Sequence, residues 1–358
     1  MIDVMHVISG LGTGGAETML VQLAGRLRDR GLVQHVVGLT MQGELVAELK
    51  RAQIGATVLG VGSAASLPGA MTSIVSLVNE LRPRIIQGWM YHGNLGAMCG
   101  HFFSRGRRER ALYWNLRASN MDERRYGSII RWSSIVSPLV DVVVANSQAG
   151  ADFHRARGFR PKRSVVIDNG IETGRFCRDT AVRDQVRREL GIAQDAIVAV
   201  KVARVDLMKD HANFLAAMQS LPEVCGLLIG SGTTDLVLPA NVKALGLRRD
   251  SERYLAASDI VVSTSAFGEG FSNVIAEGMS AELIPVATAV GDAARIVGET
   301  GWVVEPCNPA AIAEAIGQVA ALSPDQRRQK GEAARRRIVE NFTLERAVDN
   351  FARLYASY

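Results

Sequence analysis

The chain has 358 residues, 47% of them hydrophobic and 22% charged, with a formal net charge of +5. This length exceeds what one hydrophobic core usually serves, so two domains are expected. No apolar run approaches the roughly 20 residues that span a bilayer. No basic residue precedes the first apolar stretch, so neither a membrane anchor nor a signal peptide is predicted.

The cysteines and the charged residues exclude further classes of protein. Cys99, Cys177, Cys225 and Cys307 lie far apart and form no CxxC pair. Structural zinc and a disulfide framework are therefore not expected. We expect a cytoplasmic location, where cysteines stay reduced. The positive charge concentrates in residues 101–132, which hold eight arginines against three acids. No nucleic-acid partner is expected.

In the first half, short apolar runs alternate with segments of helical period. The runs cover residues 4–10, 35–40, 84–90, 111–117, 141–147 and 164–170, and a helix pattern covers 16–30. This alternation predicts parallel strands joined by crossover helices. Strands this short are expected to be buried on both faces.

The pattern breaks at residues 168–179, and the second half then repeats the same scheme. Its strand candidates cover residues 196–205, 226–232, 242–246, 259–265 and 283–289. Asn308-Pro309 and Ser323-Pro324 each offer a capping side chain followed by proline, so a helix is predicted to begin at each. The predicted domains are 1–167 and 168–340. A closing helix within 341–358 is expected to pack back on the first domain.

A glycine-rich loop follows the first strand. Gly10, Gly12 and Gly15 fit G-x-G-x-x-G directly before a helix, a loop that can bring backbone amides against phosphate. A tight turn without a ligand satisfies the same pattern. A dinucleotide-binding domain also needs an acid at the end of the second strand, where this chain has only Thr40. An NAD(P)-dependent oxidoreductase therefore stays as an alternative function.

The most informative stretch is 267–288, FGEGFSNVIAEGMSAELIPVAT. A buried strand is predicted to end at Ser265 and a helix to begin near Ser272. Glu269 then falls in a loop at the carboxyl edge of the sheet, where open α/β sheets bind ligands. The helix start suits a diphosphate, and Glu277 lies far enough along to bind sugar hydroxyls. The alternative without a ligand is that Glu269 is an ordinary acid of a loop and Glu277 a solvated helix residue.

Residues 265–291 resemble the signature of glycosyltransferase family 4, in which two glutamates eight positions apart precede a proline-containing strand and a glycine turn. Further matching segments follow the family's order: GGAE at 14–17, WMYHGN at 89–94, ANSQAG at 145–150, DNGIETGRF at 168–176 and ARVDLMKDH at 203–211. The resemblance implies two Rossmann-like α/β domains facing across a cleft, the GT-B architecture. The first domain would take the acceptor and the second the nucleotide-sugar donor.

The resemblance also implies roles for individual residues of the second domain. Arg204 and Lys209 match the basic pair placed on the donor diphosphate, where negative charge grows in the transition state. Glu277 matches the ribose-binding acid, and Glu269 the acid near the donor sugar. Backbone amides are expected to complete the cradle, those of Phe271, Ser272 and Asn273.

In the first domain, Gly14 and Gly15 match the loop that faces the donor diphosphate, and His92 matches a histidine near the transferred sugar. A lone histidine is more often structural. Its place after a strand, in a loop with glycine, favours the functional interpretation. Arg117 and Asn120 are expected to line the acceptor side.

Three positions depart from the family's pattern. Asp168 stands where relatives commonly have proline, Asp210 where glycine often follows the lysine, and Ala281-Glu282 where a Cys-Gly turn is usual. An acid beside Lys209 would weaken its phosphate contact if the two side chains paired.

No two aspartates are separated by one residue, so the sequence lacks the Asp-x-Asp pattern of metal-dependent sugar transferases. We therefore predict a retaining transferase that needs no metal ion and no cofactor, with a UDP-sugar preferred to a GDP-sugar as donor. A glycan or lipid-linked acceptor in cell-surface polysaccharide or glycoconjugate synthesis is expected. A non-catalytic nucleotide-sugar-binding protein would keep the same donor residues and stays as a second alternative.

Aromatic residues are interleaved with the arginines of 101–132. This composition predicts reversible contact with anionic lipids on the inner face of the membrane. A solvated arginine-rich helix with aromatic residues in the core is the structural alternative.

Overall fold

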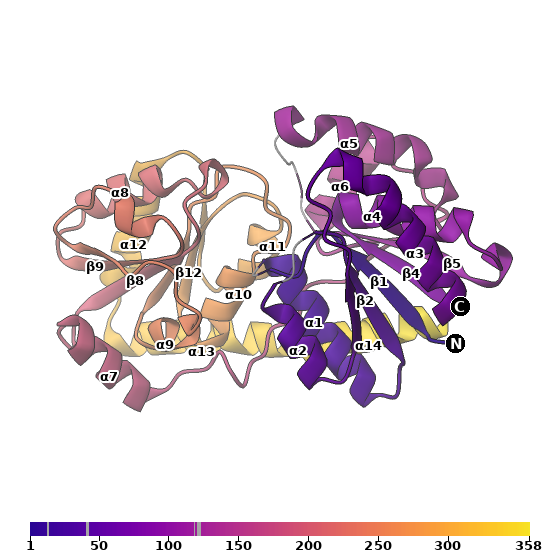
Figure 1. Cartoon of the computed structure of the whole chain (residues 1–358). Helices are drawn as coiled ribbons and strands as arrows, with labels where there is room; N and C mark the ends of the chain where they lie inside the picture. The colour runs from indigo at the N-terminus through magenta and orange to yellow at the C-terminus, as the bar shows by residue number, and fades with distance from the viewer. Residues whose placement is uncertain (13, 41–42, 118, 120–122) are drawn as a thin grey trace. The chain divides into compact units, whose positions relative to one another are not determined.

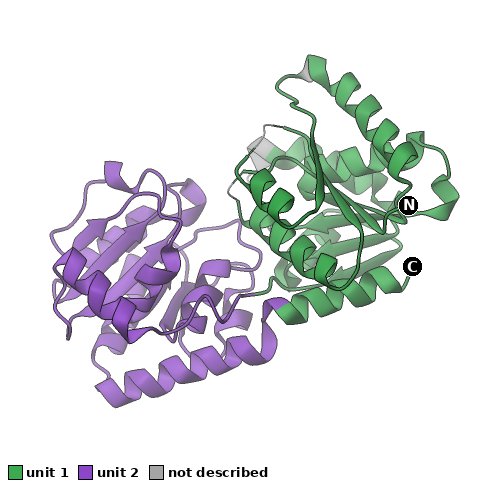
Figure 2. Cartoon of the chain, turned by 60° about the horizontal axis from the view of Figure 1, so that its bottom comes forward, with its two compact units in different colours: residues 1–170, 345–358 green, residues 171–344 purple. Residues whose placement is uncertain are grey.

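The computed structural model describes residues 1–12, 14–40, 43–117, 119 and 123–358 (Figure 1). The chain divides into two compact units, coloured separately in Figure 2. Unit 1 comprises Met1–Gly170 and Glu345–Tyr358, and unit 2 comprises Ile171–Leu344. Each unit is a parallel β-sheet with helices on both faces, which confirms the predicted fold class.

Among the described residues, unit 1 contains a seven-stranded sheet in the order β3-β2-β1-β4-β5-β6-β7, and all neighbouring strands are parallel. Its strands are β1 (Val4–Ile8), β2 (Gln34–Gly38), β3 (Gly55–Val58), β4 (Ile85–Trp89), β5 (Ala111–Leu116), β6 (Val142–Ala145) and β7 (Arg163–Val166). β3 is an edge strand with exposed and half-buried residues. It therefore lacks the continuous apolar run that predicts the other strands.

The helices of unit 1 are α1 (Gly15–Asp29), α2 (Leu45–Arg51), α3 (Leu67–Leu81), α4 (Met90–Phe103), α5 (Glu123–Val136), α6 (Gln148–Ala156) and α14 (Leu344–Ala356). Short 3-10 turns are η1 (Ala64–Ser66), η2 (Arg107–Glu109) and η3 (Ser137–Leu139). Ile74, Ala97 and Ile130, from α3, α4 and α5, share one core with the sheet residues Ile86 and Trp114.

The last helix, α14, is part of unit 1 although the chain reaches it from unit 2 (Figure 2). Phe351 is fully buried, and its ring stacks on Trp89 of β4 with centroids 6.4 Å apart. The Tyr355 hydroxyl donates to the Gln87 side-chain oxygen in the same strand. The apolar face of α14 thus completes the core of unit 1.

Among the residues described, unit 2 contains a six-stranded parallel sheet in the order β10-β9-β8-β11-β12-β13. Its strands are β8 (Ile197–Val202), β9 (Val224–Ile229), β10 (Val242–Ala244), β11 (Ile260–Ser263), β12 (Ile284–Thr288) and β13 (Trp302–Val304). Its helices are α7 (Thr180–Leu190), α8 (His211–Gln219), α9 (Ser251–Ala256), α10 (Asn273–Ser280), α11 (Ala293–Val297), α12 (Pro309–Ala320) and α13 (Pro324–Asn341), with 3-10 turns η4 (Leu207–Lys209) and η5 (Thr233–Asp235).

Alternate strand residues of unit 2 enter two different cores. Val198 and Val200 of β8 belong to a core with Ile275 of α10, while Ala199 belongs to a second core with Phe214 of α8. Helices thus cover both faces of the sheet, because successive strand side chains point to opposite sides.

The two predicted capping pairs begin helices, as expected. Asn308 Oδ1 accepts a hydrogen bond from the Ala311 N–H (3.1 Å) at the start of α12. Ser323 begins α13 with a capping box, in which its hydroxyl accepts from the Gln326 N–H (3.3 Å) and the Gln326 side chain accepts from the Ser323 N–H (2.9 Å). Within the part of the chain that the structure describes, no helix is long and apolar enough to cross a membrane.

Candidate donor site in unit 2

Two loops at the carboxyl ends of neighbouring strands lie side by side in unit 2. β8 and β11 pair in parallel, and the loop after β8 contains η4. The Ala266 N–H, in the loop after β11, donates to the Met208 carbonyl oxygen in η4 (2.8 Å). A Cβ on Gly268, which has a φ of +81°, would lie 2.6 Å from the Met208 sulfur. The fold therefore brings the predicted diphosphate and sugar residues together.

Lys209 and Glu269 form an ion pair between these loops. Lys209 Nζ donates to Glu269 Oε1, which also accepts from Ser265 Oγ (2.7 Å). The two side chains are 24% and 12% exposed. Burial raises the pKa of the Glu269 carboxyl, but the Lys209 charge, the hydrogen bonds from Lys209 and Ser265, and the charge of Lys201 outweigh burial and lower this pKa below its usual value. Glu269 is therefore anionic at neutral pH.

Arg204 lies in the same loop, closer to solvent. Its Nη2 atom is 3.2 Å from Asp206 Oδ2, and its side chain is 62% exposed. Asp206 Oδ1 accepts from the Met208 N–H (2.9 Å) and so begins η4. An exposed ion pair of this kind contributes little to folding. The guanidinium can therefore turn to an anionic ligand at small cost.

Asp210 follows Lys209 in a left-handed backbone conformation, with φ 46° and ψ 64°. This conformation favours glycine, the residue that family members often have there. The Asp210 carboxylate caps α8, where Oδ1 accepts from the Asn213 N–H (3.2 Å). Lys209 pairs with Glu269 instead, so Asp210 does not take up the Lys209 ammonium.

A turn after β12 supports the Glu269 loop. The Asp292 N–H donates to the Gly270 carbonyl oxygen (3.0 Å), and the Asp292 carboxylate accepts from Arg295 Nε (2.8 Å). Gly291 has a φ of +60°, and a Cβ there would lie 2.5 Å from the Glu269 carbonyl oxygen. Glycine is thus required at this turn both by the backbone angle and by the close approach of the Glu269 loop.

The start of α10 follows directly. Ser272 is the N-cap residue, and its hydroxyl makes no capping hydrogen bond. Phe271 is 5% exposed and packs edge to face against Phe342, with centroids 5.4 Å apart. Phe271 therefore anchors the loop in the core, while the main chain at Ser272 and Asn273 leads into the helix. The first N–H groups of a helix suit an anionic group.

Glu277 lies half-buried, further along α10. Burial raises the pKa of its carboxyl to about 7, an effect that Arg175 opposes and Glu252 increases. Arg175 and Glu252 pair with each other, Nη2 to Oε2, at 2.8 Å. The Glu277 carboxyl therefore titrates near neutral pH. Hydroxyl groups that donate hydrogen bonds to it would favour its anionic form.

Two buried polar residues near the Lys209–Glu269 pair were not predicted from the sequence as site residues. Ser265 donates to Glu269, and Lys201, only 2% exposed, lies within β8. A lysine inside the apolar run AIVAVKVARV is a signal for a buried polar contact. Ser265 has no such signal, because a serine at the end of a strand is common in any loop.

In unit 1, α1 begins at Gly15 with Gly14 as its N-cap residue. Glu17 lies in the first helical turn, so an acid already interacts with the positive end of the helix dipole. The Thr40 hydroxyl, at the position where a dinucleotide-binding domain has an acid, donates to the Ser9 carbonyl oxygen (2.6 Å). Gly14 and Gly15 thus lie at the start of α1, and the position at the end of β2 where a dinucleotide-binding domain has an acid holds Thr40.

His92 is exposed and lies in the first turn of α4, not in a loop as predicted. The chain enters the helix immediately after β4 through Met90, which has a φ of 59°. Gly93 allows α4 to approach the sheet, since a Cβ there would lie 2.4 Å from the Val7 carbonyl oxygen. His92 still lies at the carboxyl end of β4.

Arg117 follows β5 and is largely buried. Its Nη1 donates to Asn115 Oδ1 (3.2 Å), its Nη2 donates to Asn169, and its guanidinium lies 5.1 Å from the Trp89 ring centroid. Within the described residues its Nε has no hydrogen-bond partner. Burial lowers the pKa of Arg117 to about 9, which Tyr355 partly opposes. Such a guanidinium suits an anionic group on a ligand.

Residues 101–132 do not form one surface, which corrects the picture of interleaved arginines and aromatic residues. Trp114 is fully buried in β5, and Arg110 is 7% exposed and donates to Ser104 Oγ (2.6 Å). Phe103 and Trp132 are 77% and 65% exposed. A core strand thus separates two exposed parts. Asn120, predicted for the acceptor side, lies outside the described residues.

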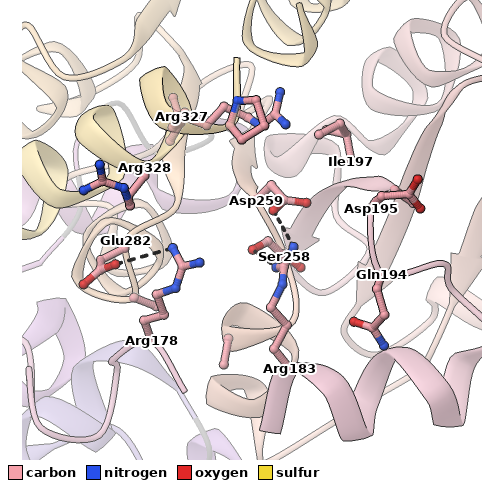
Figure 3. A pocket seen from close by; sticks show the side chains of 15 residues that line it. Arg178, Arg183, Gln194, Asp195, Ile197, Ser258, Asp259, Glu282, Arg327 and Arg328 are labelled. Atoms are coloured by element: carbon pink, nitrogen blue, oxygen red, sulfur yellow. Dashed lines mark hydrogen bonds and ion pairs between the residues drawn. The ribbon is translucent and has the colours of Figure 1, made fainter. Parts of the chain in front are cut away.

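A cavity of about 280 Å³ lies elsewhere in unit 2, near the starts of β8, β11 and β12 (Figure 3). Four of its charged side chains form two ion pairs: Arg183 with Asp259 (2.8 Å) and Arg178 with Glu282 (3.6 Å). Ligands of open α/β sheets bind at the carboxyl edge, so this cavity is not assigned to the donor. In the described ranges, no group of three or more His, Cys, Asp and Glu side chains lies together as metal ligands do.

Two Rossmann-like α/β units in one chain form the GT-B architecture, which is that of glycosyltransferases. Residues 13–175 match the family model described as Glycosyltransferase Family 4, and residues 196–321 match the model Glycosyl transferases group 1. The chain therefore carries the glycosyltransferase domains that these two family models describe, and the resemblance read from its motifs is confirmed.

Curated relatives are glycosyltransferases as well. The chain is 31% identical over 232 residues to D-inositol 3-phosphate glycosyltransferase of Geodermatophilus obscurus, a match covering 56% of this chain and 48% of that protein. It is 29% identical over 230 residues to the lipopolysaccharide core biosynthesis glycosyltransferase LpsE of Rhizobium meliloti, with 61% and 64% covered. The chain spans between about half and two thirds of the length of these relatives.

The whole chain is similar in fold to HepE of Anabaena, solved in complex with UDP. The TM-score is 0.87 at 22% identity, and 100% of both chains is covered. This likeness shows that the two α/β units share the fold of that protein.

Proposed function

We propose that the protein is a retaining, metal-independent glycosyltransferase that moves a sugar from a nucleotide-sugar donor to a glycan or lipid-linked acceptor. The observation that carries the proposal is the adjacency of Lys209, Glu269 and the start of α10 at one sheet edge. Lys209 and Arg204 supply positive charge for the departing diphosphate, which replaces that of a metal ion. Glu277 binds the ribose.

The reaction proposed is a front-face displacement. The acceptor oxygen bonds to the anomeric carbon on the face from which the phosphate oxygen leaves, and the acceptor's proton passes to that phosphate oxygen. Positive charge grows on the sugar as the bond loosens, and the Glu269 carboxylate stabilises it. Gly14 and Gly15 contribute main-chain N–H groups to the diphosphate, and His92 contacts the transferred sugar.

A UDP-sugar is the preferred donor, because HepE was solved with UDP and with UDP-glucose. A GDP-sugar is the second choice, since a relative in Komagataeibacter xylinus is named as a GDP-mannose-dependent mannosyltransferase. Relatives named for lipopolysaccharide core and teichuronic acid biosynthesis support an acceptor in cell-surface polysaccharide synthesis. The buried Arg117 guanidinium suits an anionic group on that acceptor.

We also propose that the protein works in the cytoplasm and binds the inner face of the membrane reversibly. Trp132, Ile135 and Leu139 are 65%, 60% and 50% exposed, at the spacing of one helical stripe along α5 and η3. The exposed Arg131 lies next to Trp132 in α5. Apolar side chains beside cations suit an anionic lipid surface.

The test is release of nucleoside diphosphate from a panel of UDP- and GDP-sugars, with and without glycan and lipid-linked acceptors. Turnover that depends on an acceptor is expected and would distinguish the enzyme from a nucleotide-sugar-binding protein. Lys209→Met should abolish most of this turnover, whereas Lys243→Met, at an exposed lysine of β10, should not. Binding of NADH without nucleotide-sugar turnover would favour the oxidoreductase instead.

A further inference from the structure

The buried lysine of β8 lies directly behind the Lys209–Glu269 ion pair. Lys201 is 2% exposed, and its Nζ donates to the Lys209 carbonyl oxygen (2.6 Å) and to Thr264 Oγ1 (2.7 Å). Both acceptors are uncharged. An ammonium inside a sheet without a carboxylate in contact is costly to bury. Packing alone would be served as well by leucine or methionine, so the amine has another use.

Thr264 holds the same main-chain segment as Lys201. Its side chain is fully buried at the end of β11, and its hydroxyl lies within hydrogen-bond distance of the carbonyl oxygens of Lys209 (3.1 Å) and Asp210 (2.7 Å). Lys201 and Thr264 come from two neighbouring strands and meet on one stretch of main chain. This stretch carries the Lys209 side chain and the strained, left-handed Asp210.

We infer that Lys201 is a positioning residue for the donor: it fixes the main chain of Lys209, so that the Lys209 ammonium is directed to the Glu269 loop where the diphosphate binds. The inference rests on the proposed function, since it names a residue that serves the same donor site. Thr264 acts with Lys201 in this role. A shift of about 1 Å at a reacting group can cost about a hundredfold in rate.

The charge of Lys201 also favours binding of the anionic donor. Burial lowers the pKa of its amine to about 7; Lys209 lowers it further, while Glu269 and Asp210 oppose. The charged or titratable neighbours are thus Lys209, Glu269 and Asp210, together with His211 of α8, whose pKa burial and Lys201 lower to about 4. A bound diphosphate adds negative charge and favours the ammonium, so donor binding should take up a proton near neutral pH.

The experiment uses the full chain and four variants: Lys201→Met, Thr264→Val, Thr264→Ser and the surface control Lys243→Met. Binding of UDP and of GDP is measured by calorimetry at pH 6.5 and 8.5, and donor kinetics are measured where turnover exists. Lys201→Met should lower kcat/KM for the donor about tenfold to a hundredfold. Thr264→Val should lower it in the same direction, whereas Thr264→Ser keeps the hydroxyl and should restore most of it.

The pH arm separates a positioning role from a merely structural one. Wild-type affinity for the nucleotide should weaken more between pH 6.5 and 8.5 than that of Lys201→Met, and titration of the nucleotide itself is common to both proteins. Methionine should leave the thermal midpoint unchanged or raise it, because a buried charge is removed. Lys201→Met with wild-type kcat/KM, affinity and pH dependence would overturn the inference. Tight UDP binding without any turnover by wild type would reject the transferase, and the affinity comparison would still decide the role of Lys201.

Discussion

Lys209 and Glu269 lie 60 positions apart in the sequence and share an ion pair in unit 2. Each satisfies the charge of the other. A nucleotide-sugar would offer a diphosphate to Lys209 and sugar hydroxyls to Glu269, so the pair exchanges one set of charge-assisted contacts for another. The site is therefore held ready at small electrostatic cost.

The first prediction concerns this pair. Glu269→Ala and Lys209→Ala should each lower kcat more than they raise the donor KM, because both contacts strengthen as the bond to the sugar breaks. The loss of one such contact should cost about 2.7–4 kcal/mol, or roughly a hundredfold to a thousandfold in rate. Steady-state kinetics with the donor varied measure this effect.

A double variant sharpens the same prediction. Because the two side chains contact each other, the loss in Lys209→Ala/Glu269→Ala should be smaller than the sum of the single losses. Arg328→Ala, at an exposed ion pair with Asp325 in α13, is the control and should leave kcat within a few fold. Wild-type kcat in Glu269→Ala would show that this carboxylate is structural.

The second prediction separates Glu277 from Glu269. The ribose contact exists before and during reaction, so Glu277→Ala should mainly raise the donor KM, while kcat changes less. Loss of a charged hydrogen bond costs about 1.5–3 kcal/mol, which is tenfold or more in affinity. Calorimetric titration with UDP gives this number directly. Affinity equal to wild type would refute the ribose role.

Glu277 also predicts a pH effect on stability. Its pKa rises from 4.5 to about 7 on folding. The folded protein thus keeps a proton that the unfolded chain loses, and this stabilisation is full below pH 4.5 and is lost as the pH rises to about 7. Glu277→Gln cannot ionise, so at pH 8 it should be more stable than wild type by about 1–3 kcal/mol. Denaturant unfolding measures the free energy of unfolding of both proteins at pH 5 and pH 8. The difference between Glu277→Gln and wild type should appear at pH 8 and be absent at pH 5.

Most of the fold follows from local patterns in the sequence, and the contacts of the site do not. Runs such as DIVVSTS at 259–265 become buried central strands because both faces of such strands are covered by helices. The edge strand β13 was not predicted, because its apolar run WVV at 302–304 is only three residues long. A run this short does not distinguish a strand from a loop.

The motif residues were found by their order along the chain, but their partners depend on strand order. Only the adjacency of β8 and β11 brings Lys201 to Thr264, which lies 63 positions away. His92 was expected in a loop, because no local signal shows that α4 starts immediately at Met90 with a positive φ. The sequence pattern therefore predicts the elements, and the sheet topology decides which side chains meet.

The third prediction concerns metal ions. Turnover should survive excess EDTA, because the charge of Arg204 and Lys209 and the start of α10 neutralise the leaving diphosphate. Arg204→Ala and Lys209→Ala should then be more sensitive to added magnesium than wild type. Loss of wild-type turnover on chelation, restored by magnesium, would contradict this account of charge stabilisation.

The fourth prediction concerns membrane binding. The wild-type protein should sediment with vesicles that contain anionic lipid at low salt and should be released at high salt. Trp132→Ser with Ile135→Ser should weaken binding about tenfold or more, because two apolar side chains no longer enter the interface. Val237→Ser, at a residue of unit 2 that is 93% exposed, is the matched control and should bind as wild type does. No sedimentation of wild type at low salt would contradict the prediction.

The last prediction concerns the glycine that supports the Glu269 loop. In Gly291→Ala the new Cβ meets the carbonyl oxygens of Glu269 at 2.5 Å and of Gly270 at 2.6 Å, so the loop must move. Gly191 at the end of α7 has nearly the same φ, +63° against +60°, with nothing within 4 Å of its Cβ position. Gly191→Ala therefore carries the same backbone strain, on the order of 1–2 kcal/mol, without the clash. Both variants should lose stability, and only Gly291→Ala should also lose kcat, by about tenfold to a hundredfold, because a small displacement of Glu269 weakens its contact in the transition state. Equal kcat in the two variants, measured well below their thermal midpoints, would show that the Glu269 loop tolerates the displacement.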